Sequence, residues 1–288
     1  MTTVWWTIVT KAWTATRRVS VLLAAALVAT ACGSGGGSSD TVIGKASTGH
    51  LTIAIAEDQP GSSLKGLNGD YTGFDIDVAQ FVAKELGVDP SGITWRSTVS
   101  ADRETVLENG SADMVVETYS ITDKRKKVIS FAGPYFVAGQ DLLVRLNDGD
   151  SITGPESLNG KRLCSVAGTT SAQEVKDKFA QQTKLVEYAH FSECITALLA
   201  RIVDAVTTDD LILAGYASQN PELLRVVGKT FTQERYGVGV RKGDTASVSK
   251  IDDAITKMIS TGAWNSSLQH NFGGTGYKIP SPPEITER

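Results

Sequence analysis

The chain has 288 residues, of which 41% are hydrophobic and 21% are charged, and its formal net charge is −4. A mildly acidic chain lacks the basic surplus with which proteins hold nucleic acid, so a nucleic-acid partner is excluded. The length is sufficient for one large domain or two small ones.

The first 31 residues have the features of a signal peptide. Lys11, Arg17 and Arg18 precede an apolar run over residues 19–31. This run is too short to span a bilayer comfortably, but it has the length of the hydrophobic region of a signal peptide. No later segment has the length and apolarity of a membrane span, so we expect an exported protein whose mature chain does not cross the membrane.

The apolar run ends in a motif that resembles the lipobox of bacterial lipoproteins, Ala29-Thr30-Ala31-Cys32, although a larger aliphatic residue is usual at the position of Ala29. The resemblance implies that Cys32 becomes the lipid-modified first residue of the mature chain. Gly and Ser alone make up residues 33–39, a composition typical of a flexible coil. We therefore expect a lipidated cysteine and a flexible tether over residues 32–47, which anchor the protein at the outer face of the cytoplasmic membrane.

Two cysteines remain once Cys32 is assigned to lipid, namely Cys164 and Cys194. An exported protein meets oxidising conditions, so we expect a disulfide between them, with two buried free thiols as the alternative. On the chain-entropy model such a loop contributes roughly 3–4 kcal/mol to the free energy of unfolding. Neither cysteine has a nearby histidine that suggests a metal site or a nucleophile, and we expect no metal site, no catalytic residue and no cofactor.

Strand and helix signals alternate along the rest of the chain. Strands are predicted at residues 51–56, 93–95, 114–116, 163–166, 185–186, 204–208, 224–227 and 236–240. Helices are predicted from about Asp75 to Gly87, from Ser100 to Gly110, from about Ala172, from Ser192, over residues 210–216, around residues 251–259 and around residues 264–268. The Pro-containing tail after Gly274 is expected to be loosely ordered.

Repeated β-α-β units predict an α/β fold with helices on both faces of each sheet. Two sets of these units are joined near residues 142–145 and again near residues 231–236, which indicates two lobes with a double crossover. We assign residues 48–142 and 236–288 to lobe 1 and residues 143–235 to lobe 2.

Polar residues follow three of the predicted strands, where open α/β sheets bind their ligands. Among them, Arg125 and Asp209 offer the opposite charges that an amino-acid zwitterion needs, because a guanidinium pairs with a carboxylate and a carboxylate accepts from an ammonium. The alternatives are a solvated basic run for Arg125, which lysines surround, and a helix N-cap for Asp209, with Asp210 as a rival.

From residue 51 to about residue 272, the chain resembles the family 3 solute-binding proteins of ABC amino-acid importers, and within them the glutamate- and glutamine-binding lipoproteins of Gram-positive bacteria. The resemblance lies in the order and spacing of several stretches: residues 58–61 (DQPG), 73–79 (GFDIDVA), 118–125 (TYSITDKR), 131–135 (FAGPY), 163–170 (LCSVAGTT) and 236–240 (YGVGV). It implies a two-lobed periplasmic-binding-protein-like fold of type II, with a mixed sheet flanked by helices in each lobe.

The resemblance also implies the ligand contacts. Arg125 would hold the α-carboxylate, together with the Ser120 hydroxyl, groups at Thr170 and the N-terminus of the helix that opens at residues 169–172. The ammonium would be bound by Asp209, with Thr118 as a further polar contact. Thr169 and Thr170 have the alternative role of capping their helix.

Selectivity for the side chain of the ligand depends on other charges. If the ligand is glutamate, its distal carboxylate needs a cation, and Lys65 and Arg103 are the candidates, each with a surface charge as the alternative. Glu57 and Glu117 depart from the pattern of the relatives. If both acids face the pocket, a neutral amide or a cationic ligand is favoured; if they point outward, nothing changes. Strand alternation alone does not decide between these orientations.

We therefore expect a monomeric, non-enzymatic receptor that captures a polar amino acid, glutamate or glutamine, in an interlobe cleft and delivers it to ABC permease subunits. A receptor for a cationic or other amino acid is one alternative. An enzyme on the same fold, of the dehydratase or lytic transglycosylase type, is another, with Glu57 or Glu117 as general acid. A receptor's sensing module is a third, which would need a downstream signalling segment.

Overall fold

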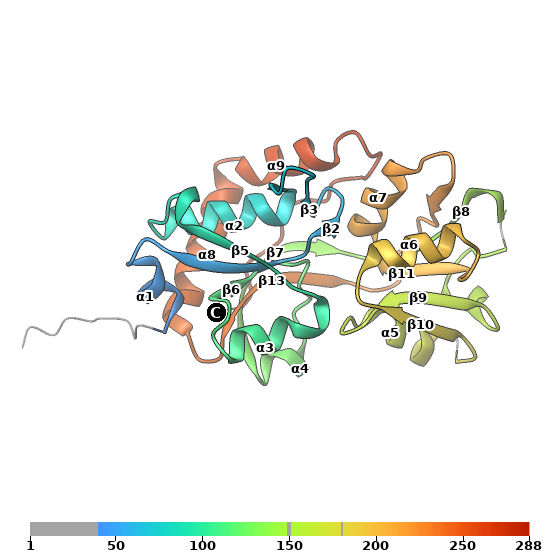
Figure 1. Cartoon of the computed structure of the whole chain (residues 1–288), viewed down its shortest axis with the longest axis horizontal. Helices are drawn as coiled ribbons and strands as arrows, with labels where there is room; N and C mark the ends of the chain where they lie inside the picture. Colours follow the sequence, from blue (N-terminus) through green and yellow to red (C-terminus); the bar gives the residue numbers. More distant parts are fainter. Residues whose placement is uncertain (1–39, 149–150, 180, 288) are drawn as a thin grey trace, which may run out of the picture. The chain divides into compact units, whose positions relative to one another are not determined.

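The computed structural model describes residues 40–287 except 149–150 and 180. The expected signal peptide, the lipidated Cys32 and the start of the tether lie outside these residues. Two five-stranded sheets organise the described chain, and both appear in Figure 1. All of the described residues belong to one compact unit.

The first sheet has the strand order β5-β1-β6-β13-β7. Its strands β1, β5 and β6 run parallel, whereas β13 is antiparallel to β6 and β7. Its bounds are β1 Leu51–Ile55, β5 Ile93–Ser97, β6 Met114–Val115, β7 Ile129–Ala138 and β13 Glu234–Arg241.

Helices cover both faces of this sheet, and its inner strands β1, β6 and β13 are therefore buried along most of their length. One core holds apolar side chains of α2 (Phe74–Glu85), α8 (Thr245–Ser260) and α9 (Ala263–Phe272). A second core, on the other face, includes Val106 and Leu107 of α3 (Arg103–Glu108). Along the chain, the 3-10 helix η2 (Ser100–Asp102) directly precedes α3, α4 (Asp123–Lys126) lies between β6 and β7, and the 3-10 helix η1 (Pro90–Gly92) lies between α2 and β5.

The second sheet has the strand order β10-β9-β11-β8-β12, and only β8 runs against its neighbours β11 and β12. Its bounds are β8 Gln140–Arg145, β9 Arg162–Val166, β10 Lys184–Tyr188, β11 Ala205–Asp209 and β12 Leu224–Val226. Helices α6 (Phe191–Leu199) and α7 (Asp210–Gln219) pack on one face, and α5 (Ser171–Lys178) packs on the other. The 3-10 helices η3 (Leu146–Asp148) and η4 (Pro155–Leu158) lie between β8 and β9.

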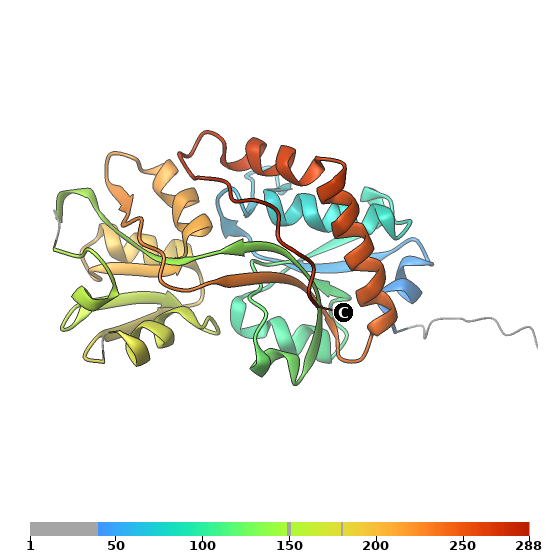
Figure 2. The ribbon, with the colours of Figure 1, turned by 180° about the vertical axis from the view of Figure 1, so that it is seen from behind.

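The chain passes between the two sheets twice, from β7 to β8 and from β12 back to β13, and Figure 2 shows both connections. The structure thus confirms the predicted α/β fold with a mixed sheet in each lobe and a double crossover. The chain leaves the first sheet at Ala138 and enters the second sheet at Gln140, a few residues before the predicted division at residues 142/143. The reason is that β8 begins directly after Gly139, so the crossover has no separate linker.

The expected tether ends earlier than predicted, because residues 42–46 form helix α1 (Val42–Ala46) instead of coil. Val42 and Ala46 are buried, and the Val42 amide donates to Asp244 Oδ2 at 2.8 Å. This helix therefore fastens the start of the described chain to the N-terminus of α8.

The C-terminal tail is also better ordered than predicted. The amides of Thr286 and Glu287 both donate to the carbonyl oxygen of Gly133 at 2.9 Å. The Tyr277 hydroxyl donates to Asp210 Oδ1 at 3.2 Å. A further small sheet that was not predicted consists of β2 (Asp58–Gln59), β3 (Ser63–Lys65) and β4 (Tyr71–Thr72).

The predicted disulfide is present between Cys164 on β9 and Cys194 on α6, whose Cα atoms are 5.6 Å apart. It ties a central strand of the second sheet to the helix above it. In the described part of the chain, no helix has both the length and the apolarity required to cross a membrane.

Candidate functional site

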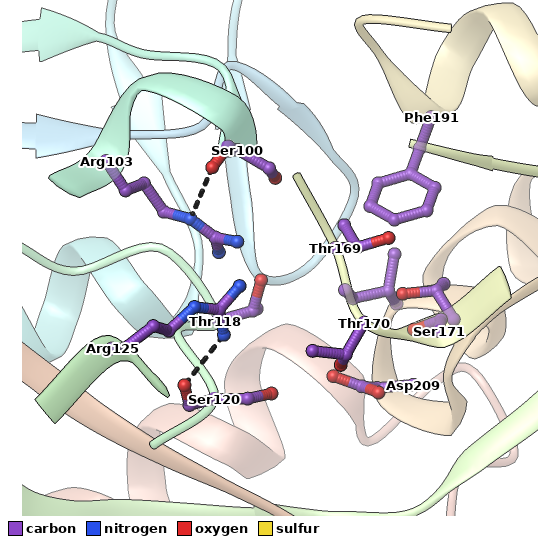
Figure 3. Close-up of a pocket in the computed structure, with 12 residues that line it drawn as sticks. Ser100, Arg103, Thr118, Ser120, Arg125, Thr169, Thr170, Ser171, Phe191 and Asp209 are labelled. Carbon is purple, nitrogen blue, oxygen red and sulfur yellow. Dashed lines mark hydrogen bonds between the residues drawn. The ribbon is translucent and has the colours of Figure 1, made fainter. Parts of the chain in front are cut away.

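A cavity between the two lobes collects most of the predicted ligand-binding residues. Figure 3 shows Arg103, Thr118, Ser120 and Arg125 on one side, facing residues of the second lobe, Asp209 among them, on the other. The empty space, part of it open to solvent, is about 300 Å³. The lining residues are Ser100, Arg103, Thr118, Ser120, Arg125, Thr169, Thr170, Ser171, Phe191, Thr208, Asp209 and Ile212.

Arg125 is the one buried residue of its basic run, with 5% of its surface exposed, whereas Lys124 and Lys127 are exposed. Helix α4 places it, because Thr122 caps that helix by accepting from the Arg125 amide at 3.2 Å. The structure therefore does not support the solvated-run interpretation of Arg125.

The guanidinium of Arg125 is held from several sides. It donates to Glu104 Oε1 at 3.1 Å, to the Ser120 carbonyl at 2.7 Å and to the Gly168 carbonyl at 3.0 Å. Gly168 belongs to the second lobe, so this last bond joins the lobes. These contacts use three of the five N–H donors of the group, which leaves capacity for a carboxylate in the cavity.

Arg103 is a second buried guanidinium in the same cavity, with 3% of its surface exposed. Its Nε donates to the Ser100 carbonyl and its Nη1 donates to the Glu117 carbonyl, both at 3.1 Å. The guanidinium carbons of Arg103 and Arg125 lie 4.4 and 4.8 Å from the centroid of the Tyr119 ring. Stacking on one aromatic ring keeps two like charges at fixed places in the cavity wall.

Asp209 supplies the opposite charge from the second lobe. It ends β11 and begins α7, and its side chain makes no capping bond to that helix. Its Oδ2 accepts from the Tyr236 hydroxyl at 2.6 Å, while Oδ1 is buried without a hydrogen-bond partner among the described residues. Burial, and next the charge of Glu234, raise the pKa of Asp209 to about 8.

Thr118 has an unusual backbone conformation, with φ at +39°, a region that non-glycine residues seldom occupy. Buried Asp75 holds it there, because Asp75 Oδ2 accepts from the Thr118 amide at 2.7 Å. The Thr118 hydroxyl donates to Gln59 Oε1 at 3.2 Å, so its lone pairs are available to accept. Strain maintained by a buried carboxylate at a cavity wall is typical of a functional residue.

Three of the candidate ligand residues, Glu57, Lys65 and Glu117, do not line the cavity. Glu57 and Lys65 pair with each other at 3.9 Å, and about a third and a half of their side chains, respectively, are exposed. Glu117 is buried behind Ser100, which contacts it at 3.5 Å, and it does not line the cavity. Burial raises the pKa of Glu117 to about 8, so desolvation is the main influence on this acid.

Several lining residues escaped sequence analysis as ligand residues: Ser100, Ser171, Phe191, Thr208 and Ile212. Ser100 stood out only as a helix cap, and Ser192 was expected to cap the helix that in fact begins at Phe191, after His190. The approach of the two lobes decides which residues line the cavity, and the local sequence does not predict that approach. The positions of Ser171 and Thr208, next to the predicted Thr170 and Asp209, were the available hint.

Comparisons with a family model, with characterised relatives and with solved structures agree with one another. Residues 51–274 match the family described as bacterial extracellular solute-binding proteins, family 3. The glutamate-binding protein GluB of Corynebacterium efficiens is 40% identical over 264 residues, which cover 88% of this chain and 89% of that protein. The ABC transporter glutamine-binding protein GlnH of Bacillus subtilis is 34% identical over 255 residues, which cover 85% of this chain and 92% of that protein.

Among solved structures, an ancestral arginine-binding protein bound to arginine superposes with a TM-score of 0.73 at 36% identity. The match covers 78% of this chain and 99% of that one. This likeness agrees with the type II fold expected from the sequence.

Proposed function

This chain belongs to family 3 of the bacterial extracellular solute-binding proteins, and we propose that it captures free glutamate between its lobes and delivers it to the permease subunits of an ABC transporter. One observation carries the proposal: two buried arginines line the same cavity as one buried acid, an oxygen of which has no hydrogen-bond partner among the described residues. Glutamate carries two carboxylates and one ammonium, which is the complementary set of charges.

Each charge of the ligand then has a counterpart. The α-carboxylate pairs with the remaining donors of Arg125, with help from the Ser120 hydroxyl and the N-terminus of α5, at Thr170 and Ser171. The ammonium donates to Asp209 Oδ1 and to the Thr118 hydroxyl. Because these groups come from both lobes, the grip is complete only when the lobes meet.

Arg103 is the group we assign to the distal carboxylate. Lys65 is less suitable, since it lies outside the cavity and pairs with Glu57. The two acids that would have repelled a glutamate side chain, Glu57 and Glu117, do not line the cavity either. The relatives named for glutamate and glutamine binding support this ligand class.

A receptor fits the cavity better than an enzyme does. A general acid must reach the atom that it protonates, and neither of the two acids considered for that role, Glu57 and Glu117, lines the cavity. Asp209, the acid that does, is the proposed partner of the ligand ammonium. We therefore propose binding and transfer without chemical change of the ligand.

Titration calorimetry of the purified protein against glutamate, glutamine, aspartate and arginine tests this proposal. We expect glutamate to bind most tightly. In Arg103→Gln we expect a loss of roughly 100-fold in affinity for glutamate, because a charge-assisted pair is lost, and little change for glutamine. Lys65→Gln is the matched control, for which we expect no change in the preference.

Absence of binding to every amino acid would contradict the receptor. Tighter binding of glutamine than glutamate by the unaltered protein would leave the receptor in place and assign the cavity to a neutral amide. If Lys65→Gln abolished the preference for glutamate and Arg103→Gln left it intact, the proposed role of Arg103 would be refuted.

A further inference from the structure

The two lobes also meet outside the cavity, where Asp58 of β2 contacts the second lobe. Its Oδ2 accepts from the Ser192 amide of α6 at 2.9 Å. The Tyr216 hydroxyl of α7 donates to the Asp58 backbone carbonyl and lies 3.2 Å from Asp58 Oδ2. Neither Asp58 nor these two partners line the cavity. One residue of the first lobe thus contacts two helices of the second.

The electrostatics of α6 favour this contact. A helix N-terminus carries a partial positive charge and unpaired amides. Glu193, within α6, accepts from the amides of Ala189 and His190 at 3.1 and 3.0 Å. The Ser192 amide instead finds its acceptor in the other lobe. The carboxylate of Asp58 therefore supplies a negative charge that the N-terminus of α6 requires, and His190 Nδ1 lies 4.0 Å from Asp58 Oδ1.

The backbones fit closely beside this contact. A Cβ atom added to Gly215 of α7 would lie 2.0 Å from the carbonyl oxygen of Pro60, closer than real atoms approach. Only glycine at position 215 allows α7 to lie against the segment that carries Asp58. This packing is an observation independent of the hydrogen bonds, and it indicates the same joint between the lobes.

We propose that Asp58 is a latch that holds the lobes closed and thereby raises the affinity for the ligand without touching it. The proposal rests on the proposed capture of an amino acid between the lobes. The latch acts on α6 and α7, which also carry Phe191 and Ile212 of the cavity wall. Asp58 is thus a positioning residue, whose loss makes the lobes separate more readily and the ligand leave faster.

The test uses two variants that break the latch in different ways. Asp58→Ala removes the charge-assisted bond to Ser192, and Gly215→Ala keeps Asp58 but forces α7 away from Pro60. We expect each to weaken amino-acid affinity about tenfold, mainly through faster dissociation in stopped-flow measurements. The ratio of the affinities for glutamate and glutamine should stay unchanged, because the cavity contacts remain. Asp253→Ala, an aspartate with a 73% exposed side chain, is the matched control.

Small-angle scattering of the ligand-free protein gives a readout that does not depend on any ligand. We expect a larger radius of gyration for Asp58→Ala and Gly215→Ala than for the unaltered protein and Asp253→Ala. Unchanged dissociation rates and an unchanged radius in both folded latch variants would overturn the latch. If the unaltered protein bound no amino acid, the proposed function would fail, and the scattering comparison would still decide on the latch.

Discussion

At the scale of single residues, the protonation of Asp209 should make ligand binding depend on pH. Its Oδ2 accepts from Tyr236 and its Oδ1 has no partner among the described residues. Burial raises the pKa of Asp209 to about 8, so at pH 7 the ligand-free protein holds a proton there. An ammonium that binds beside the carboxylate favours the ionised form and expels this proton.

We therefore expect amino-acid affinity to increase as the pH rises from 6 to 8.5, with most of one proton released per ligand at pH 7. Calorimetry in two buffers of different ionisation enthalpy measures that release. Asp209→Asn should bind much more weakly and release no proton from this site. Affinity that does not change over this pH range would show that Asp209 is already ionised before the ligand arrives.

Raised pKa values of buried acids also affect folding stability. Ligand affinity should increase as the pH rises, whereas this contribution to stability decreases. A carboxyl whose pKa is raised in the folded state binds its proton more tightly there than in the unfolded chain. Burial raises the pKa of Asp75 to about 7 and that of Glu117 to about 8. The contribution of these acids to the free energy of unfolding is complete below about pH 4 and is lost as the pH rises through 7 to 8.

At the scale of elements, short helices and strand ends place the charged groups of the cavity. A single turn of helix, α4, turns Arg125 inward, while Lys124 and Lys127 are exposed. In the second lobe, the end of a strand has this role. In the β9–α5 connection, the hydroxyl of the cavity residue Thr169 shares a hydrogen bond of 3.1 Å with the hydroxyl of Ser165. Ser165 follows Cys164, so the disulfide lies next to the strand that supports this connection.

Removal of the disulfide should lower the stability of the second lobe. For Cys164→Ala with Cys194→Ala, we expect a loss of about 3–4 kcal/mol in the free energy of unfolding, because the unfolded chain gains the freedom of a loop closed over a sequence separation of 30. Urea titration followed by circular dichroism measures it. Reducing agent should weaken the unaltered protein by a similar amount and leave the double variant unchanged. Equal stability of the two proteins would show that the bond does not form.

At the scale of the whole molecule, the position of the folded part relative to the membrane depends on the proposed lipid anchor. Helix α1 fixes the chain from Val42 onward, so eight residues separate the expected lipid-bearing Cys32 from Thr41. A stretch of that length reaches about 30 Å at full extension. The folded part would therefore stay close to the bilayer, within reach of a permease.

The anchor is tested by Cys32→Ser. We expect this variant to appear in the soluble fraction and to lose incorporation of labelled palmitate, because no acyl chain holds it at the membrane. Ligand affinity should not change, because the proposed ligand contacts are made by other residues. Retention of Cys32→Ser with the membrane fraction would contradict lipidation at this cysteine.

The sequence by itself determined the repeating strands and helices and the family, and it predicted Arg125 and Asp209, which line one cavity, as partners of a zwitterion. These follow from local periodicity, from residues that end helices and strands, and from the order of short motifs, all of which act over a few residues. The ordered tail and helix α1 were not predicted from the sequence, because their partners Gly133 and Asp244 lie more than a hundred residues away along the chain.

Only the tertiary structure decided which charges line the cavity. Arg103 points inward and Lys65 outward, and Glu117 lies behind the wall instead of in it. The direction of a side chain depends on what packs against its strand or helix, and here the neighbours come from distant segments and from the other lobe. For that reason the sequence predicted a polar amino-acid ligand, glutamate or glutamine, and only the arrangement of Arg103 beside Arg125 supports the choice of glutamate between them.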